Sequence, residues 1–401
     1  MEDAATAIAY ARERGLPLAV RGGGHNVAGS AVCDGGVVVD FSELREVRVD
    51  PERRRAVAQP GATWYDFDQA TQAHGLATTG GLVSSTGVAG FTLGGGIGWL
   101  VRKHGLACDN LVAADVLTAR GDTLRAADDA DADLLWGLRG GGGNFGVVSS
   151  FEYRLHPLQA VSGGLVGHPR DRARDVLQLF RDLCASAPDE LTLIAALMTT
   201  PEGHPAVGLA ACYSGPEEAA AEVLRPLKEF GPPVLDQLGP IPYTVLQSAL
   251  DPTAPRGMQN YWKADFLPEL SDEAIDIVVE QANRMTSPLA QIHIHHLGGA
   301  VRHAPAGAGS AFAHRDAAFV YNVVGMWTDS ADNERQIGLV RDAFSALQPV
   351  SSGGAYINFL GDDGSDRIRA AYGRNYARLA QLKARLDPEN VFRLNQNIAP
   401  A

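Results

Sequence analysis

The sequence has few cysteines, and they lie far apart. Cys33, Cys108, Cys184 and Cys212 form no C-x-x-C pair. This spacing indicates neither a disulfide framework nor a zinc site. Scattered free cysteines are typical of proteins in a reducing compartment, so we expect the protein to be cytoplasmic.

Long apolar runs and basic clusters are also missing. No stretch reaches the ~18 apolar residues that a membrane span needs, and the acidic start, Met1 to Ala4, is not typical of a signal peptide. The chain has 34 Lys and Arg against 47 Asp and Glu, a formal net charge of −13, with no Lys/Arg run. We therefore expect neither nucleic acid nor a membrane among its partners.

Glycine, in contrast, is abundant, with 45 of 401 residues. Three clusters stand out, at 22–24, 94–98 and 140–143. Without a Cβ, consecutive backbone N–H groups can turn toward phosphate oxygens, although glycine also serves ordinary tight turns. Three clusters in one region favour a long phosphate-bearing ligand.

Known nucleotide motifs narrow the choice of ligand. There is no G-x-x-x-x-G-K-[ST] motif, and the run at Gly94 has Trp99 where a Rossmann fingerprint needs its last glycine. A dinucleotide held by several separated loops is the better description.

Hydrophobic periodicity predicts short helices alternating with short strands up to about residue 157. Thr63 is a candidate N-cap, and Gly15 and Gly75 are candidate helix stops. This alternation is typical of an α/β or α+β fold. The expected elements are helices at 3–15 and 64–74, a buried strand at 37–39, and strands at 18–21, 47–49, 55–58, 112–118 and 147–153.

Longer amphipathic helices begin after residue 157, and the glycine-rich style returns after 349. The middle of the chain therefore reads as an inserted α+β domain, with the C-terminal end returning to the first part. The expected elements there are helices at 171–187, 216–230, 271–286 and 332–347, strands at 191–198 and 319–326, and a final helix at 366–386.

His25 and the pair His293 and His295 are candidates for a role in chemistry or ligand binding. His25 follows three glycines on a loop, where a neutral imidazole could add to an electrophilic carbon of a bound ring, or could simply cap a turn. His293 and His295 share one face if 293–296 is a strand. Pocket lining is our first interpretation of this pair and strand packing the second. No third ligand is evident nearby, so we expect no metal.

Two further charged residues are pocket candidates. Lys263, in the run Tyr261-Trp262-Lys263, could orient an oxygenated substrate, while Trp262 could belong to the pocket wall or to the core. Arg315 is either a pocket or interdomain charge, or a paired surface arginine.

Several motifs occur in a characteristic order. They are Arg21 to Asn26 with Gly29 and Ser30, Gly80-Gly81, Ser85 to Gly90, Gly94 to Gly96, Arg102 to Asn110, Trp136 to Gly146, Tyr356 to Phe359, Tyr372 to Tyr376, Asp387 to Phe392 and Asn395 to Ile398. In this order they resemble the berberine bridge enzyme-like flavoproteins of the vanillyl-alcohol oxidase superfamily. The resemblance is strong over 1–155 and 350–401 and loose between them.

The resemblance implies an α+β fold, a two-subdomain FAD-binding domain of PCMH type with an inserted antiparallel-sheet substrate domain. The implied parts are 1–157 (FAD-binding), 158–349 (substrate-binding) and 350–401 (return to the FAD-binding domain). Family members usually carry a further N-terminal segment before the helix at 3–15, and this sequence begins without it. The implied cofactor-binding residues are Arg21, Gly22, Gly23, Gly24, His25, Asn26, Gly29, Ser30, Gly80, Gly81, Ser85, Thr86, Gly87, Gly90, Gly95, Gly96, Gly98, Cys108, Asp109, Asn110, Gly142, Gly143, Asn144, Gly146, Val147, Asn358, Asn395 and Gln396.

The resemblance also implies covalent FAD. His25 matches the histidine that bonds the flavin 8α-methyl carbon. The cysteine that bonds flavin C6 in many members falls near Val83, so we expect attachment through His25 only. Cys108 lies in a different segment, where a small packed residue near the cofactor is expected.

The implied activity is that of an oxidase. Such an enzyme takes a hydride from an alcohol, amine or activated carbon to flavin N5 and reduces oxygen to peroxide. Tyr356 matches the family's active-site tyrosine and is the candidate base, although it could instead close the core. The expected substrate pocket is Lys263, His293, His295 and Tyr356. Alternatives are a dehydrogenase of the same fold with another acceptor and a flavin-holding protein without turnover. The substrate and the oligomeric state stay open.

Overall fold

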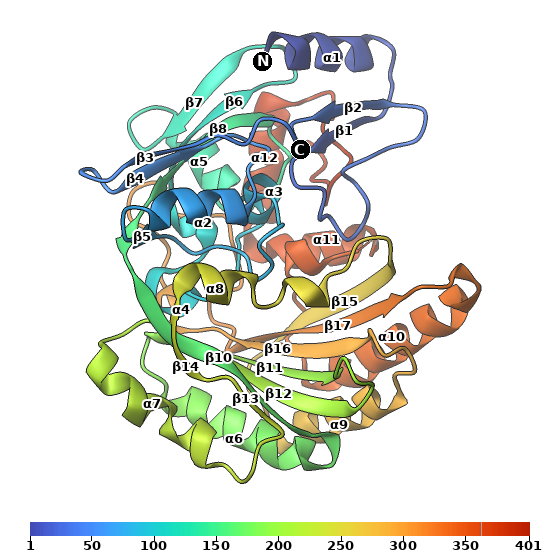
Figure 1. The fold of residues 1–401 in the computed structure, drawn as a ribbon. Coiled ribbons are helices and arrows are strands. Elements are labelled where there is room, and N and C mark those ends of the chain that lie inside the picture. Colours follow the sequence, from blue (N-terminus) through green and yellow to red (C-terminus); the bar gives the residue numbers. More distant parts are fainter. Residues whose placement is uncertain (362) are drawn as a thin grey trace.

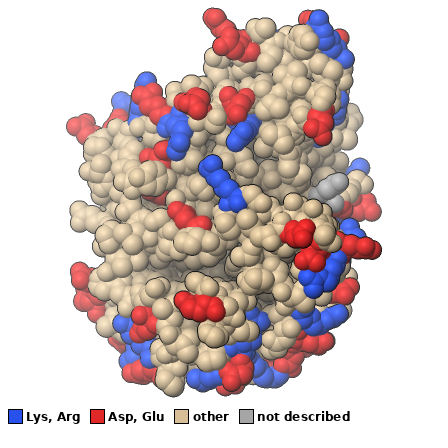
Figure 2. Space-filling model, turned by 45° about the vertical axis from the view of Figure 1, so that its right-hand side comes forward, with Lys and Arg blue, Asp and Glu red and all other residues tan. Residues whose placement is uncertain are grey.

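The computed structural model describes residues 1–361 and 363–401. Figure 1 shows two halves, with the blue N-terminal and red C-terminal segments together in the upper half and the green to orange middle of the chain below. No helix in the described residues is both long and apolar enough to cross a bilayer. On the face drawn in Figure 2, acidic and basic side chains are interspersed.

The first part of the chain carries five helices, α1 to α5, and several short strands around a five-stranded sheet, in the order β3-β4-β8-β6-β7. Strands β1 and β2 form a separate parallel pair, and β5 pairs with β9. The elements are α1 (Glu2–Glu13), β1 (Leu18–Arg21), β2 (Val37–Asp40), β3 (Val47–Asp50), β4 (Arg55–Ala58), α2 (Trp64–Gln72), β5 (Leu76–Ala77), α3 (Val88–Leu93), α4 (Val101–His104), β6 (Leu111–Leu117), β7 (Thr123–Ala127), α5 (Ala132–Leu138), β8 (Val147–Arg154) and β9 (His156–Pro157).

The middle of the chain forms an eight-stranded antiparallel sheet. Its order is β13-β10-β12-β11-β16-β17-β15, with β14 also paired to β10. The elements are β10 (Ala160–Pro169), α6 (Ala173–Ser186), β11 (Leu191–Thr199), β12 (Pro205–Tyr213), α7 (Glu217–Glu229), β13 (Leu235–Asp236), β14 (Gly239–Pro242), α8 (Tyr243–Ser248), β15 (Gln259–Leu267), α9 (Asp272–Arg284), β16 (Gln291–His296), β17 (Phe319–Trp327) and α10 (Asn333–Leu347).

One face of this sheet is covered by α6, α7, α9 and α10, which lie beneath it in Figure 1. Because side chains alternate along a strand, only every second residue packs on these helices. Leu193 and Leu197 of β11 and Ile292 and Ile294 of β16 belong to that core, together with Phe180 of α6. The residues between them point to the upper half.

The chain ends in two helices, α11 (Gly364–Tyr372) and α12 (Tyr376–Leu386), which lie in the upper half. The prediction of one helix over 366–386 was therefore wrong. Gly373 has a φ of 48°, outside the right-handed helical region, and it separates the two helices. Buried Leu379 and Leu382 of α12 join the core that contains Phe151 of β8.

The predicted helix cap and helix stops are present in the structure. Thr63 caps α2 with a full capping box, because its side chain accepts from the Asp66 N–H and Asp66 accepts from the Thr63 N–H. Gly15 and Gly75 follow their helices with φ values of 63° and 64°. The strand at 37–39 exists, but only Val39 of it is buried, because β2 has a single neighbour, β1.

The division of the chain at residues 157 and 349 stays a prediction. It is supported by the sheet, which begins with β10 at Ala160, and by α10, which ends at Leu347 before the chain rejoins the upper half.

Candidate active site

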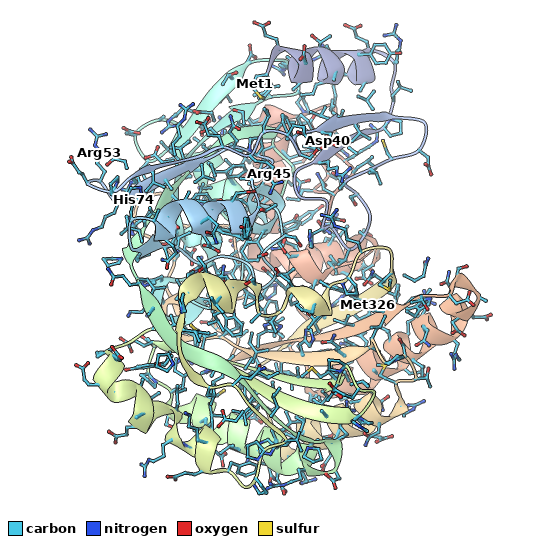
Figure 3. All side chains as sticks on the ribbon, in the orientation of Figure 1. Met1, Asp40, Arg45, Arg53, His74 and Met326 are labelled. Atoms are coloured by element: carbon cyan, nitrogen blue, oxygen red, sulfur yellow. The ribbon has the colours of Figure 1, made fainter. Side chains whose placement is uncertain are left out.

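A large cavity lies between the glycine loops of the upper half and the free face of the eight-stranded sheet. Its volume is about 1870 Å³. Met326, labelled in Figure 3, lines it from β17. The cavity brings together the following predicted site residues: Gly22, Gly23, Gly24, His25, Asn26, Ser30, Thr86, Gly87, Gly90, Gly142, Gly143, Gly146, Val147, His293, His295, Tyr356, Asn358, Asn395 and Gln396.

Close backbone approach explains several of the glycines in the walls. A Cβ on Gly22 would lie 2.8 Å from the Pro60 carbonyl oxygen, and one on Gly23 would collide with the backbone of Gly87. A Cβ on Gly90 or Gly143 would meet nothing within 4 Å, because both face open space. The first two glycines let two loops meet, and the other two leave room inside.

His25 faces the cavity from the loop after β1. Its Nε2 lies 3.0 Å from Ser85 Oγ. Desolvation by the surrounding loops lowers the pKa of His25, and Arg256 lowers it further, while Asp251 raises it. The imidazole is therefore neutral at pH 7, which is the form able to act as a nucleophile.

The loop that carries Ser85 is fixed from the middle of the chain. Asp251 accepts from the Ser84 N–H at 2.7 Å and from the Ser84 hydroxyl at 2.6 Å. Because Ser84 is adjacent to Ser85, this contact also holds the hydroxyl that meets His25.

Tyr356 is the most densely hydrogen-bonded side chain that we find in the cavity wall. Its phenolic oxygen accepts from the Gly96 N–H at 3.0 Å, the Ile97 N–H at 3.1 Å and the Asn358 side-chain amide at 2.9 Å. Burial raises the pKa of Tyr356, while the bonds from Asn358, Ile97 and Gly96 lower it; the net direction is upward. The phenol is therefore neutral at rest, with three donors aimed where a phenolate charge would develop.

Two amides of the C-terminal segment also face the cavity. Asn395 donates to the Gly143 carbonyl at 3.1 Å, while its Oδ1 is buried without a partner among the described residues. Gln396 donates to the Leu360 carbonyl at 3.2 Å. These contacts fix the C-terminal segment to the glycine loop at 140–143 and leave an acceptor for a ligand.

A short polar strip crosses the sheet floor of the cavity. It consists of Gln291, His293 and His295 of β16 and Asn322 of β17, with His293 directly opposite Asn322. His293 Nε2 lies 2.6 Å from Gln291 Oε1. Both ring nitrogens of His295 and the Oδ1 of Asn322 are buried without partners in the described part of the chain.

The two strip histidines are uncharged at pH 7. Burial lowers the pKa of His293 to about 4. Burial, together with the neighbouring His293, lowers the pKa of His295 to about 3. His296 points away from this strip, and its Nε2 lies 3.0 Å from the Arg102 guanidinium.

Lys263 is not brought to the cavity. Trp262 lines it, and the next residue of the strand must point to the opposite face. There the Lys263 ammonium pairs with Asp363 and lies 5.5 Å from the Tyr261 ring centroid. Adjacent residues of a strand point to opposite faces of the sheet. Of residues 261–263, only Trp262 therefore lines the cavity.

Other predicted cofactor residues do not line the cavity. They are Arg21, Gly29, Gly80, Gly81, Ser85, Gly95, Gly96, Gly98, Cys108, Asp109, Asn110 and Asn144. Several have clear supporting contacts. The Cys108 N–H donates to the Gly95 carbonyl at 2.8 Å, Asn110 bonds to the His104 and Leu106 carbonyls, and Asn144 bonds to the Gly141 carbonyl.

Arg315 is the interdomain charge that the sequence left as one of several options. It is buried and donates to Asp109 at 2.6 and 3.1 Å. It also donates to the carbonyls of Val301 and His303. It does not line the cavity, so it supports the segment at 108–110 from behind.

Comparisons with known proteins show the family of this chain. Residues 1–127 match the family model "FAD binding domain", and residues 355–399 match "Berberine and berberine like". The chain is 33% identical, over its full length, to an FAD-linked oxidoreductase of Dictyostelium discoideum, of which it covers 87%. The chain belongs to the berberine bridge enzyme-like family of FAD-linked oxidoreductases. It is therefore an enzyme.

Other members show the same relationship. The chain is 30% identical to (R)-6-hydroxynicotine oxidase of Paenarthrobacter nicotinovorans, over 99% of its own length and 89% of that protein. The crystal structure of 6-hydroxy-D-nicotine oxidase from Arthrobacter nicotinovorans aligns with a TM-score of 0.86 at 25% identity, covering 99% of this chain and 90% of that one. Chitooligosaccharide oxidase, at 22% identity with 99% and 89% of the chains covered, has a TM-score of 0.84 and shows the fold alone. The expected PCMH-type α+β fold is confirmed.

An FAD fits the residues of this family site. Gly90 and Gly143 border open space, the glycine loops present backbone rather than side chains, and Asn395 offers an unpartnered amide oxygen. Among residues 1–361 and 363–401, no three His, Cys, Asp or Glu side chains group as metal ligands.

Sequence reasoning missed Gln291, Asn322 and Phe359 as cavity residues. Asn322 could have been found, because it is the one polar side chain in the apolar run Phe319 to Met326. Phe359 packs edge-to-face on Tyr356 at 4.8 Å between ring centroids, across the short 3-10 turn Ile357–Phe359.

Proposed function

We propose that this FAD-linked oxidoreductase is an oxidase. It takes a hydride from an alcohol, amine or activated carbon of a small molecule to flavin N5 and passes the electrons to oxygen, forming peroxide. The observation that carries this proposal is the one cavity that joins the glycine loops to Tyr356 and to the polar strip. One relative, 30% identical over nearly the full chain, is named (R)-6-hydroxynicotine oxidase, which supports the proposal.

The FAD would be held by the glycine loops and by the amides of Asn358, Asn395 and Gln396. We propose that it is covalently attached through His25 only. His25 is a neutral imidazole on the cavity wall, and residue 83 is a valine. Burial, together with Asp109, raises the pKa of the Cys108 thiol well above its usual range, so this sulfur lacks the thiolate form that attacks carbon.

The bound flavin supplies the hydride acceptor. Tyr356 would accept the proton that leaves the substrate hydroxyl or amine as its C–H bond breaks. The N–H groups of Gly96 and Ile97 and the Asn358 amide stabilise the phenolate form that can do so. Phe359 and Trp262, whose ring centroids are 6.0 Å apart, would close the site against water beside it.

The proposal also covers the partners and the cellular location of the enzyme. The partners would be a small-molecule substrate and oxygen. The cytoplasmic location rests on cysteine usage alone, and the four cysteines of the described structure are free thiols.

Denaturing mass spectrometry of the purified protein tests the attachment, with the visible spectrum recorded beforehand. We expect the wild type to keep the mass of one FAD through denaturation and His25→Ala to lose it. His74→Ala, at an exposed histidine that follows α2 and does not line the cavity, is the matched control and keeps the mass. FAD that washes out of the wild type would contradict covalent attachment, and a protein without flavin would overturn the whole proposal.

Peroxide release tests the choice of acceptor. A substrate that reduces the flavin without air should yield one peroxide per turnover in air. Flavin reduction without peroxide would indicate a dehydrogenase that uses another acceptor.

A further inference from the structure

The floor of the cavity is almost entirely aliphatic outside the polar strip. Over the middle of β10, β12 and β11 it is formed by Leu165, Ala210, Ile194, Ala196 and Met198, with Pro169, Thr199, Pro205 and Ala206 at the strand ends. Cross-strand register places them in adjoining rows: Leu165 is opposite Ala210, which is opposite Ile194, which is opposite His295. We call the five residues named first the apolar shelf. It adjoins the strip directly.

The cavity wall carries almost no charge. Among the described residues that line it, Glu202 is the single Asp, Glu, Lys or Arg, and it is exposed in the turn between β11 and β12. The histidines of the strip are neutral at pH 7. Lys263, which the sequence offered as a pocket cation, lies on the other face of the sheet and is paired with Asp363.

The strip nevertheless requires a polar partner. A neutral imidazole has one donor and one acceptor nitrogen, and both nitrogens of His295 are buried and unpartnered. The Asn322 Oδ1 is a further buried acceptor without a partner. Buried polar atoms are normally satisfied, so these atoms indicate the position of a ligand group that both donates and accepts.

We propose that the substrate is an uncharged, largely apolar molecule that lies on the apolar shelf and directs one hydroxyl, carbonyl or neutral ring nitrogen to the strip at His295 and Asn322. This inference rests on the proposed function and specifies its substrate class. A charged group would lose its hydration without gaining a counter-ion. An oligosaccharide would bury hydroxyls against the shelf, where the side chains offer no hydrogen-bond partner.

A matched panel of probes tests this proposal on the wild-type holoenzyme. The neutral probe is 4-isopropylbenzyl alcohol. Its charged counterparts are 4-(hydroxymethyl)benzoate and 4-(aminomethyl)benzyl alcohol, and xylobiose represents the sugars. Binding is followed without air by the change in the flavin's visible spectrum, which requires no turnover. We expect the neutral probe to bind about 100-fold more tightly than either charged one.

Three results would overturn the proposal. They are a charged probe that binds as tightly as the neutral one, xylobiose as the tightest ligand, and no binding of the neutral probe at millimolar concentration. The flavin content is measured first. A protein without flavin refutes the proposed function, whereas a flavoprotein that prefers charged probes or sugar refutes only the substrate class.

His295→Phe tests the strip, because it keeps an aromatic ring and removes both nitrogens. We expect binding of the neutral probe to weaken about 10-fold. His168→Phe is the matched control: His168 is a buried histidine of the same sheet that packs on Phe230 on the helix side, and its replacement should leave binding unchanged. If His295→Phe does not fold, Gln291→Leu at the start of β16 replaces it. Equal binding in the strip variant and the control contradicts the proposal.

Discussion

At the scale of single residues, the site depends on neutral groups held in defined positions. His25 is kept uncharged and faces Ser85, and Tyr356 is buried under three donors. His25 acts in its neutral form, whereas Tyr356 can act as a base only after it has lost its proton. Protonation states therefore decide what each residue can do, and pH is the natural variable with which to examine them.

Ser85 is expected to position His25 for attachment. If Nε2–H donates to the Ser85 hydroxyl, the lone pair lies on Nδ1, which is then free to bond carbon. Ser85→Ala should slow covalent incorporation about 5- to 10-fold, as for a lost hydrogen bond, while Ser85→Thr should retain it. The measurement is the covalent fraction over time when apoprotein is mixed with FAD. Equal rates in Ser85→Ala and the wild type would contradict a positioning role.

Tyr356 should impose a rising pH profile on flavin reduction. Its pKa is raised, so the phenolate fraction grows tenfold for each pH unit below that value. The reduction rate should therefore climb with pH through pH 10 without a plateau. Tyr356→Phe should lower the rate by about 10²- to 10⁴-fold and remove the slope. Stopped-flow reduction without air gives both results, and an unchanged slope in Tyr356→Phe would rule out this base.

At the scale of elements, helices of the upper half meet the middle of the chain through buried polar contacts. Asp68 of α2 accepts from the Gln247 amide of α8 at 2.7 Å. Arg102 of α4 donates to the Leu191 carbonyl at 2.8 Å and to the Ala187 carbonyl at 3.0 Å. These contacts fix the walls of the cavity relative to each other.

The contact between α2 and α8 should make stability depend on pH. Burial raises the pKa of Asp68 from 3.8 to about 7. Between these values the folded state holds a proton that the unfolded state has lost, so the free energy of unfolding falls as pH rises. Asp68→Asn should remove this pH-dependent loss of unfolding free energy, which amounts to about 4 kcal/mol at most. The difference in Tm between variant and wild type should grow from pH 4 to pH 7, and a constant difference would contradict the raised pKa.

Arg102 should be essential for stability and not for chemistry. Its guanidinium is buried and bonds several carbonyl oxygens of the middle of the chain. Arg102→Ala leaves these acceptors without partners and should cost about 3 kcal/mol or more. Arg102→Lys keeps the charge but loses the planar fork, so it should rescue only part of the loss. Urea unfolding measures both, and a wild-type midpoint for the alanine variant would contradict the assignment.

At the scale of the whole molecule, much of the fold follows from local patterns. The predicted strands at 18–21, 191–198 and 319–326 all form, as does the hairpin of β3 and β4. Period-two alternation also places His293 and His295 on one face. The break at Gly373 carried the same glycine signal as the helix stops at Gly15 and Gly75. The exposure of β2 could not be predicted, because it depends on what packs beside the strand.

The site was predictable to a different extent. Family motifs identified the glycine loops, His25 and Tyr356 that line the cavity, yet Lys263 points away from it and Asn322 was not foreseen. Such errors arise because a sequence shows which residues alternate but not which face is the inner one. The facing direction is set by α6, α9 and α10, which lie far along the chain from some of the strands that they cover.

The two faces of the eight-stranded sheet have different roles: one packs on helices and the other lines the cavity. Along β11 and β16, the residues that pack on helices alternate with those that line the cavity. Substitutions that change the substrate can therefore accumulate at the cavity-lining positions, while the helix-packing positions keep the protein folded. Diversification of such an enzyme, in nature or in a directed library, needs to sample only every second residue of these strands.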